Sequence, residues 1–118
     1  MTAGTSRHAG VAARWGGLTV AEQLAHVGSE VERALRAHEA RHDARRDLAL
    51  ARALELFDLT ATDPRWRGPR RREILRAREE FCAQLLAEHP PACAASGLRK
   101  YFLAFAVLAR RAPSEARR

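Results

Sequence analysis

The feature that most constrains the fold is an apolar stripe that begins at Val20 and recurs every three or four residues. Its members are Val20, Leu24, Val27, Val31, Leu35 and His38. This spacing matches an α-helix, with about 3.6 residues per turn, and not the alternation of a strand. Thr19 precedes the stripe and Glu22 follows three residues later, which is the pattern of a capping box. A helix is therefore predicted from residue 20 to about residue 41.

Two more helices are predicted from apolar runs and the prolines that interrupt them. The second spans 43–61 and stops at Asp63-Pro64, because a residue before proline is pushed out of the helical region. Apolar residues cover a wide arc of this helix, which predicts a central place in the fold. The third spans about 69–89, with proline at its first position, and Pro90-Pro91 ends it.

The fourth predicted helix starts near Gly97, with Ser96 as its N-cap. It is apolar all round, which indicates burial on every side or contact with another chain. Four helices with short connections predict an all-α fold, a single-domain antiparallel bundle of about four helices over residues 18–112. The segments 1–17 and 113–118 are predicted to be flexible, except that Trp15 can pack onto the body.

Length and apolar content allow one domain with one core. The chain has 118 residues, of which 47% are apolar. The N-terminus lacks an apolar signal segment, and the longest uncharged apolar run, 101–109, is about half of a bilayer span. We therefore expect a cytoplasmic protein without membrane association. Cys82 and Cys93 are expected to be reduced, and no metal or cofactor is predicted, since the Cys82-His89-Cys93 spacing fits no zinc module.

The net charge of +7 is concentrated in the second half of the chain. Residues 1–63 carry eight arginines and nine acidic residues, whereas residues 64–118 carry thirteen basic and five acidic residues. Every basic residue except Lys100 is arginine. This one-sided use of arginine also accompanies GC-rich coding, so charge alone does not indicate a nucleic-acid partner.

An arginine cluster surrounds Trp66 between the second and third helices. Its members are Arg65, Arg67, Arg70, Arg71 and Arg72. Guanidinium groups bind phosphate and an exposed indole can stack on a base, so one hypothesis is a nucleic-acid-binding loop over 65–72. The alternative, which we favour, is a solvated loop with Trp66 folded onto the bundle.

Two charged residues fall within apolar surroundings on neighbouring predicted helices. Asp58 lies among leucines of the second helix, and Arg78 lies on the inner face of the third. Because buried charges need partners, a structural ion pair is predicted. The alternative is that each side chain extends to the edge of the interface.

The stretch from Leu18 to Arg110 resembles a group of short, uncharacterised bacterial helical proteins. The resemblance is clearest in ALARALELFDLTATDPRWRGPRRREILRAREEFC and in LRKYFLAFAVLARR. It implies a helical fold and an intracellular bacterial setting, and it carries over no activity, cofactor or site residue.

A second resemblance concerns a short motif. Arg33 and His38 form an R-x4-H spacing, which is similar to the motif of HEPN-type ribonucleases, helical bundles that cleave RNA at a dimer groove. Arg36 and His42 match the motif equally well, and Ala34 stands where a polar residue usually follows the arginine. A HEPN-like ribonuclease is therefore the weakest functional alternative, and no catalytic residue is predicted.

The apolar circumference of the fourth helix favours a non-enzymatic interaction or regulatory module. It would act as a homodimer or bind a protein partner through this helix. The candidate interface residues are Tyr101, Leu103, Phe105 and Val107. Nucleic-acid binding through the arginine cluster is the alternative.

Overall fold

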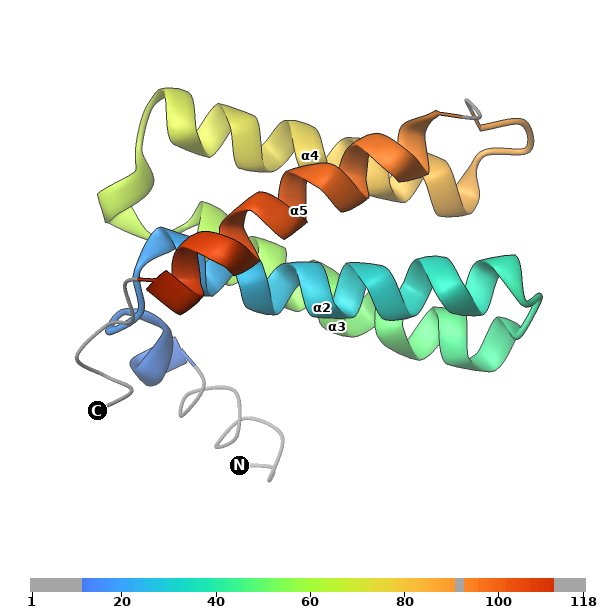
Figure 1. Ribbon diagram of the computed structural model, residues 1–118, viewed down its shortest axis with the longest axis horizontal. Coiled ribbons are helices and arrows are strands. Elements are labelled where there is room, and N and C mark those ends of the chain that lie inside the picture. Colours follow the sequence, from blue (N-terminus) through green and yellow to red (C-terminus); the bar gives the residue numbers. More distant parts are fainter. Residues whose placement is uncertain (1–11, 91–92, 112–118) are drawn as a thin grey trace.

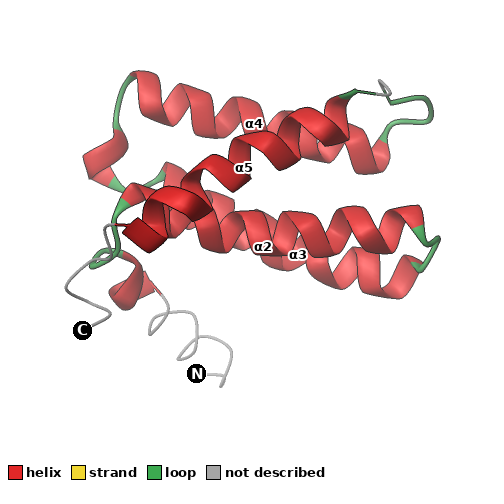
Figure 2. Cartoon of the chain, in the orientation of Figure 1, coloured by secondary structure: helices red, strands yellow, loops and turns green. Residues whose placement is uncertain are grey.

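The computed structural model describes residues 12–90 and 93–111, and the regular structure of these residues is entirely helical (Figure 2). The elements are a helical turn at 12–15, α2 (Val20–Glu39), α3 (Asp43–Ala61), a 3-10 turn η1 (Pro64–Trp66), α4 (Pro69–Leu86) and α5 (Ala94–Arg111). The all-α prediction is confirmed. None of the helices in the described ranges is long and apolar enough to cross a membrane.

The start of α2 confirms the predicted capping box. The Thr19 hydroxyl accepts a hydrogen bond from the Glu22 N–H at 3.1 Å, and the Glu22 carboxylate accepts one from the Thr19 N–H at 3.0 Å. These bonds satisfy two of the amides that the first helical turn leaves without partners. The apolar stripe that follows is buried in its central part, at Leu24, Val27, Val31 and Leu35.

The turn between α2 and α3 is closed by main-chain hydrogen bonds. The N–H of His42 bonds to Ala37 O at 2.8 Å, and the N–H of Arg41 bonds to His38 O at 3.1 Å. This is the Schellman pattern, with Arg41 in the left-handed position at φ 58°. His42 then caps α3, because its Nδ1 accepts from the Arg45 N–H at 3.3 Å. The turn sends α3 back along α2 (Figure 1).

The helix that lies centrally is α2, not α3. α2 packs against α3 along its length, against α5 and, over a smaller area, against α4 (Figure 1). The prediction of a central place for residues 43–61 is wrong, because Leu48 is 56% exposed and α3 buries a single stripe. That stripe consists mainly of the small and aromatic residues Ala49, Ala53, Phe57 and Ala61, with leucines to either side.

Two predicted helix ends are also wrong. α4 ends at Leu86, before the predicted end near His89. α5 begins at Ala94, so Ser96 and Gly97 lie within its first turn and Ser96 is not the N-cap. The N–H of Gly97 already bonds to Cys93 O at 3.1 Å. Tertiary packing of Leu98 thus outweighs the low helix propensity of glycine at this position.

Three phenylalanines join α3, α4 and α5 in the core. The ring of Phe57 lies 6.0 Å from that of Phe81 and 5.9 Å from that of Phe102, and Phe57 and Phe81 are fully buried. Trp15 is also buried, at 7% exposure, so the packed body includes the helical turn at 12–15. The N-terminal segment up to residue 11 and the tail from residue 112 lie outside the described residues.

α2 and α5 approach each other closely at Gly28. A Cβ at this position would lie 2.7 Å from the Cβ of Phe102, which is closer than real contacts allow. The substitution Gly28→Ala is therefore expected to destabilise the fold by about 1–3 kcal/mol through overpacking. Urea unfolding measures the change. Gly97→Ala is the control, because nothing lies within 4 Å of an added Cβ there. It should stabilise α5 by up to about 1 kcal/mol, and equal losses in both variants would contradict the argument.

Candidate functional site

The structure places Trp66 and Arg65 in internal contacts. The Trp66 indole N–H donates to Gln23 Oε1 at 2.7 Å, and the guanidinium of Arg65 lies 4.5 Å from the centre of the indole ring. Arg65 Nη2 donates to Asp63 Oδ2 and to Leu18 O, each at 2.8 Å. The indole N–H of Trp66 and the Nε and Nη2 groups of Arg65 are therefore already bound within the protein.

Gln23 connects three segments of the chain, and the sequence alone did not indicate it. It is fully buried, and its Nε2 donates to Trp15 O at 2.8 Å and to Asp63 Oδ2 at 3.0 Å. Trp15 is held in turn by its indole N–H, which donates to the Thr60 hydroxyl at 3.1 Å. The network joins the segment before α2, the end of α3 and η1. The only sign of this role in the sequence is that a polar residue, Gln23, stands next to Leu24 of the apolar stripe.

Hydrogen bonds from Arg65 hold the pKa of Asp63 at about 2, below its usual value of 3.8, and a bond from Gln23 acts in the same direction. The unfolded chain therefore binds a proton at Asp63 more readily than the folded chain. The resulting stabilisation is complete above the unfolded pKa and is lost as the pH falls from about 4 toward 2.

This shift predicts an acid dependence of stability. Between pH 5 and pH 2 the folded chain should lose about 2 kcal/mol through Asp63. Chemical unfolding of the wild type and of Asp63→Asn at both pH values measures the difference, since the asparagine variant lacks this titration. Parallel losses in the two proteins would show that Asp63 is not linked to folding.

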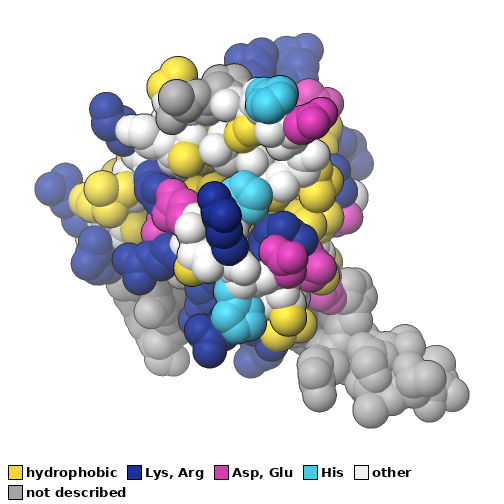
Figure 3. Space-filling view, turned by 90° about the vertical axis from the view of Figure 1, so that its right-hand side faces the viewer, with side chains coloured by type: hydrophobic (Ala, Val, Ile, Leu, Met, Phe, Trp, Pro, Cys, Tyr) yellow, Lys and Arg dark blue, Asp and Glu magenta, His cyan; other side chains and the backbone are white. Residues whose placement is uncertain are grey.

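The other members of the arginine cluster divide into two groups. Arg70 pairs with Glu73 at 2.9 Å and lies 5.5 Å from the ring centre of Phe105, and Arg71 donates to Asp63 O at 3.3 Å. Arg67 and Arg72 are exposed, and their side chains make no hydrogen bond or ion pair within the described residues. Figure 3 shows the opposite end of the molecule, which carries the α2–α3 turn. Basic side chains there are interspersed with acidic ones and form no single patch.

Arg78 and Asp58 meet between α4 and α3. Arg78 Nε lies 3.2 Å from Asp58 Oδ1, with the side chains 33% and 62% exposed. The ion pair therefore lies at the surface and not in the core. A pair exposed to this extent contributes at most about 1 kcal/mol.

The residues of the ribonuclease-like motif serve local contacts. Arg33 pairs with Glu30 at 2.6 Å, and the side chain of His42 caps α3. Arg33 and His38 are five residues apart on one helix, which places them about 140° apart around its axis. The structure therefore does not bring this arginine and histidine together on one face of the protomer.

The four candidates on α5 lie on two opposite faces. Tyr101 donates to Glu73 Oε1 at 2.7 Å, and its ring packs 5.1 Å from that of Phe105. Burial, followed by the bond to Glu73, raises the pKa of Tyr101 well above its usual range. Leu103 lies on the other side of the helix and is 59% exposed, whereas Val107 is half-buried. Leu103 is thus the candidate most open to a partner.

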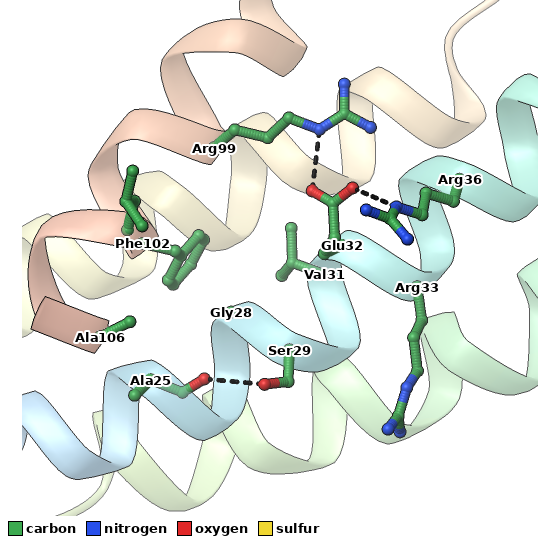
Figure 4. Close-up of a pocket in the computed structure, with 11 residues that line it drawn as sticks. Ala25, Gly28, Ser29, Val31, Glu32, Arg33, Arg36, Arg99, Phe102 and Ala106 are labelled. Atoms are coloured by element: carbon green, nitrogen blue, oxygen red, sulfur yellow. Dashed lines mark hydrogen bonds and ion pairs between the residues drawn. The ribbon is translucent and has the colours of Figure 1, made fainter. Parts of the chain in front are cut away.

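Leu103 lies at a groove of about 580 Å³ between α2 and α5. Its apolar lining comprises Ala25, Gly28, Val31, Phe102, Leu103 and Ala106, and its polar lining comprises Ser29, Glu32, Arg33, Arg36 and Arg99 (Figure 4). The small side chains on both helices leave the space, and the buried residues Val31 and Phe102 form its floor.

Ion pairs hold the two walls of the groove together. Glu32 accepts from Arg99 at 2.8 Å and from Arg36 at 2.9 Å (Figure 4). Arg99 also pairs with Glu39 at 3.0 Å. Partial burial acts to raise the pKa of Glu32, but the hydrogen bonds from both arginines outweigh it and lower the pKa. The hydrogen bonds to Glu39 and Glu32 raise the pKa of Arg99, which therefore remains charged.

The groove provides apolar contact and ion pairing. Ser29 lines it, but the hydroxyl donates to Ala25 O at 3.3 Å. Cys82 and Cys93 are free thiols, and the described part of the chain contains no group of three or more His, Cys, Asp or Glu residues that could hold a metal ion. Comparisons with protein-family models, curated proteins and solved structures found no match.

Proposed function

We propose that this chain is a non-enzymatic cytoplasmic interaction or regulatory module, built as an antiparallel bundle of four helices, which binds a protein through the groove between α2 and α5. The observation that carries the proposal is Leu103, a large apolar side chain that is 59% exposed beside a concave apolar surface. Grooves of this kind bind helices of partner proteins, either a second copy or another chain.

The groove is formed before a partner arrives. The close contact of Gly28 with Phe102 and the ion pairs of Arg99 with Glu32 and Glu39 hold α2 and α5 in place. A preformed site loses little conformational entropy on binding. Complete burial of a leucine contributes about 1.5–3 kcal/mol, so covering the exposed part of Leu103 would contribute roughly half of that.

The nucleic-acid alternative draws less support from the structure. It depends on an accessible indole and a set of available guanidinium groups. Gln23 binds the indole N–H of Trp66, and Arg65, Arg70 and Arg71 each keep an internal partner, so only Arg67 and Arg72 of the cluster have no side-chain partner within the described residues. With the indole held internally and three of the five guanidinium groups paired, the cluster is a weaker nucleic-acid-binding surface than the sequence suggested.

The proposal is tested by photo-crosslinking in the cells that produce the protein. A photoreactive amino acid is placed at Leu103 and, as a matched control, at Leu48, which is 56% exposed on α3. We expect a covalent adduct of one defined mass from position 103 and none from position 48. Mass spectrometry then identifies the adduct as a second copy or another protein. Equal background at both positions would contradict the proposal.

A further inference from the structure

Two ion pairs within α2 beside the groove expose their arginines more than their carboxylates, whereas Glu39 is more exposed, at 53%, than its partner Arg99, at 35%. Arg33 is 65% exposed and its partner Glu30 is 13% exposed, while Arg36 is 78% exposed and its partner Glu32 is 35% exposed. The guanidinium groups therefore face the solvent, and the carboxylates lie closer to the protein. A molecule that approaches α2 at Arg33 and Arg36 therefore meets positive charge first.

The two exposed arginines retain hydrogen-bond donors. A guanidinium group has five N–H donors in one plane. Arg33 uses Nη1 for Glu30, and Arg36 uses Nε for Glu32, so within the described residues both Nη groups of Arg36 and Nη2 of Arg33 have no partner. Each arginine can thus bind an external carboxylate while it keeps its internal ion pair.

The groove has an apolar end and a charged end. Because α5 runs back along α2, Ala106 lies near Ala25 at one end, and Arg99 lies near Glu32 and Arg36 at the other (Figure 4). The α2 residues that line it, from Ala25 to Arg36, span about 16 Å, or three helical turns. This length and this division of polarity suit a short amphipathic helix.

The α5 helix of a second copy lacks the complementary charge. An isologous dimer through this groove would place α5 against α5 of the other copy. α5 carries Arg99, Lys100, Arg110 and Arg111 and no acidic residue, so the two helices would repel each other. Charge complementarity therefore favours a different protein over self-association.

We infer that the groove binds an acidic amphipathic helix of another protein, with the apolar face of that helix over Phe102 and Leu103 and its carboxylates at Arg33 and Arg36. This inference rests on the proposed function and specifies the partner of the same groove. The partner segment should carry apolar residues at helical spacing over three turns and an excess of Asp and Glu at one end.

Selection from a displayed library of helical peptides, randomised at apolar and flanking positions, tests the partner chemistry. We expect the selected peptides to carry Asp or Glu beside an apolar stripe. Fluorescence anisotropy with a labelled selected peptide should show about tenfold weaker binding to the Arg33→Gln/Arg36→Gln protein, from the loss of charge-assisted contacts. The control Arg45→Gln/Arg52→Gln, two exposed arginines on α3, should bind as the wild type does.

The outcomes separate the inference from the proposed function. Neutral or basic peptides whose binding is lost in Leu103→Asn would overturn the inference and leave the groove as an interaction site. Binding that is unaffected by Leu103→Asn and by the arginine variants would overturn both. A dimer of the free protein, abolished by Leu103→Asn in sedimentation experiments, would replace the acidic helix with a second copy. Salt-sensitive binding of an RNA or DNA duplex through Arg33 and Arg36 would replace it with a nucleic acid.

Discussion

Replacing Gln23 with leucine is expected to destabilise the folded chain by about 3 kcal/mol, because leucine keeps the volume but removes three hydrogen bonds. Trp15 O and the Trp66 indole N–H would lose their bonds to Gln23, and the Asp63 carboxylate would retain only its bonds to Arg65. Each buried polar group that loses its partner costs about 1–3 kcal/mol. Urea unfolding followed by tryptophan fluorescence measures the change, and both indoles report on the same region.

Gln84→Leu is the matched control for this substitution. Within the described residues the Oε1 atom of Gln84 is buried without a hydrogen-bond partner, so the same chemical change removes no bond from that atom. The free energy of unfolding should therefore not fall, because an unpaired buried oxygen is removed. If the two variants lose equal stability, the network around Gln23 does not hold the three segments together.

Replacing Phe57 with alanine is expected to have an effect of similar or greater size, about 3–5 kcal/mol. Phe57 is fully buried and lies between Phe81 and Phe102, so its loss opens a cavity where α3, α4 and α5 meet. Domains of this size are stable by about 5–15 kcal/mol, so the variant should unfold at much lower urea concentration.

Leu48→Ala controls for the loss of a large apolar side chain on the same helix. Leu48 is 56% exposed, and its truncation should change the free energy of unfolding by less than about 0.5 kcal/mol. A loss below 1 kcal/mol for Phe57→Ala would show that the core around the three rings can collapse to fill the space.

Phe57 also connects the core to the proposed binding groove. Phe102 packs against Phe57 on one side and forms the groove floor beside Gly28 on the other. A change at Phe57 should therefore alter binding as well as stability. A substitution in the core thus changes binding and stability together. Phe105 packs against the core, whereas Leu103 is exposed, so a substitution of Leu103 tests the interaction more directly.

Local signals were enough to predict the helices. The capping box at Thr19, the stripe from Val20 and the Asp63-Pro64 stop were each read from a few neighbouring residues, and α2 and α3 have the predicted starts. These signals act through hydrogen bonds and dihedral angles within one or two helical turns. The end of α4, at Leu86, and the start of α5 were exceptions. At α5, packing of Leu98 extended the helix through Ser96-Gly97, a sequence that is typical of a cap.

Tertiary structure alone decided which surfaces remain open. Arg65 and Trp66 look like a nucleic-acid-binding pair in the sequence, but they are bound by Leu18 and Gln23, more than forty residues away. The groove likewise lies where α5 packs against α2, and there Arg99 meets Glu32, which is 67 residues distant along the chain. Helix propensity and capping depend on residues within a few positions of one another, whereas exposure of a side chain depends on which distant residue packs against it.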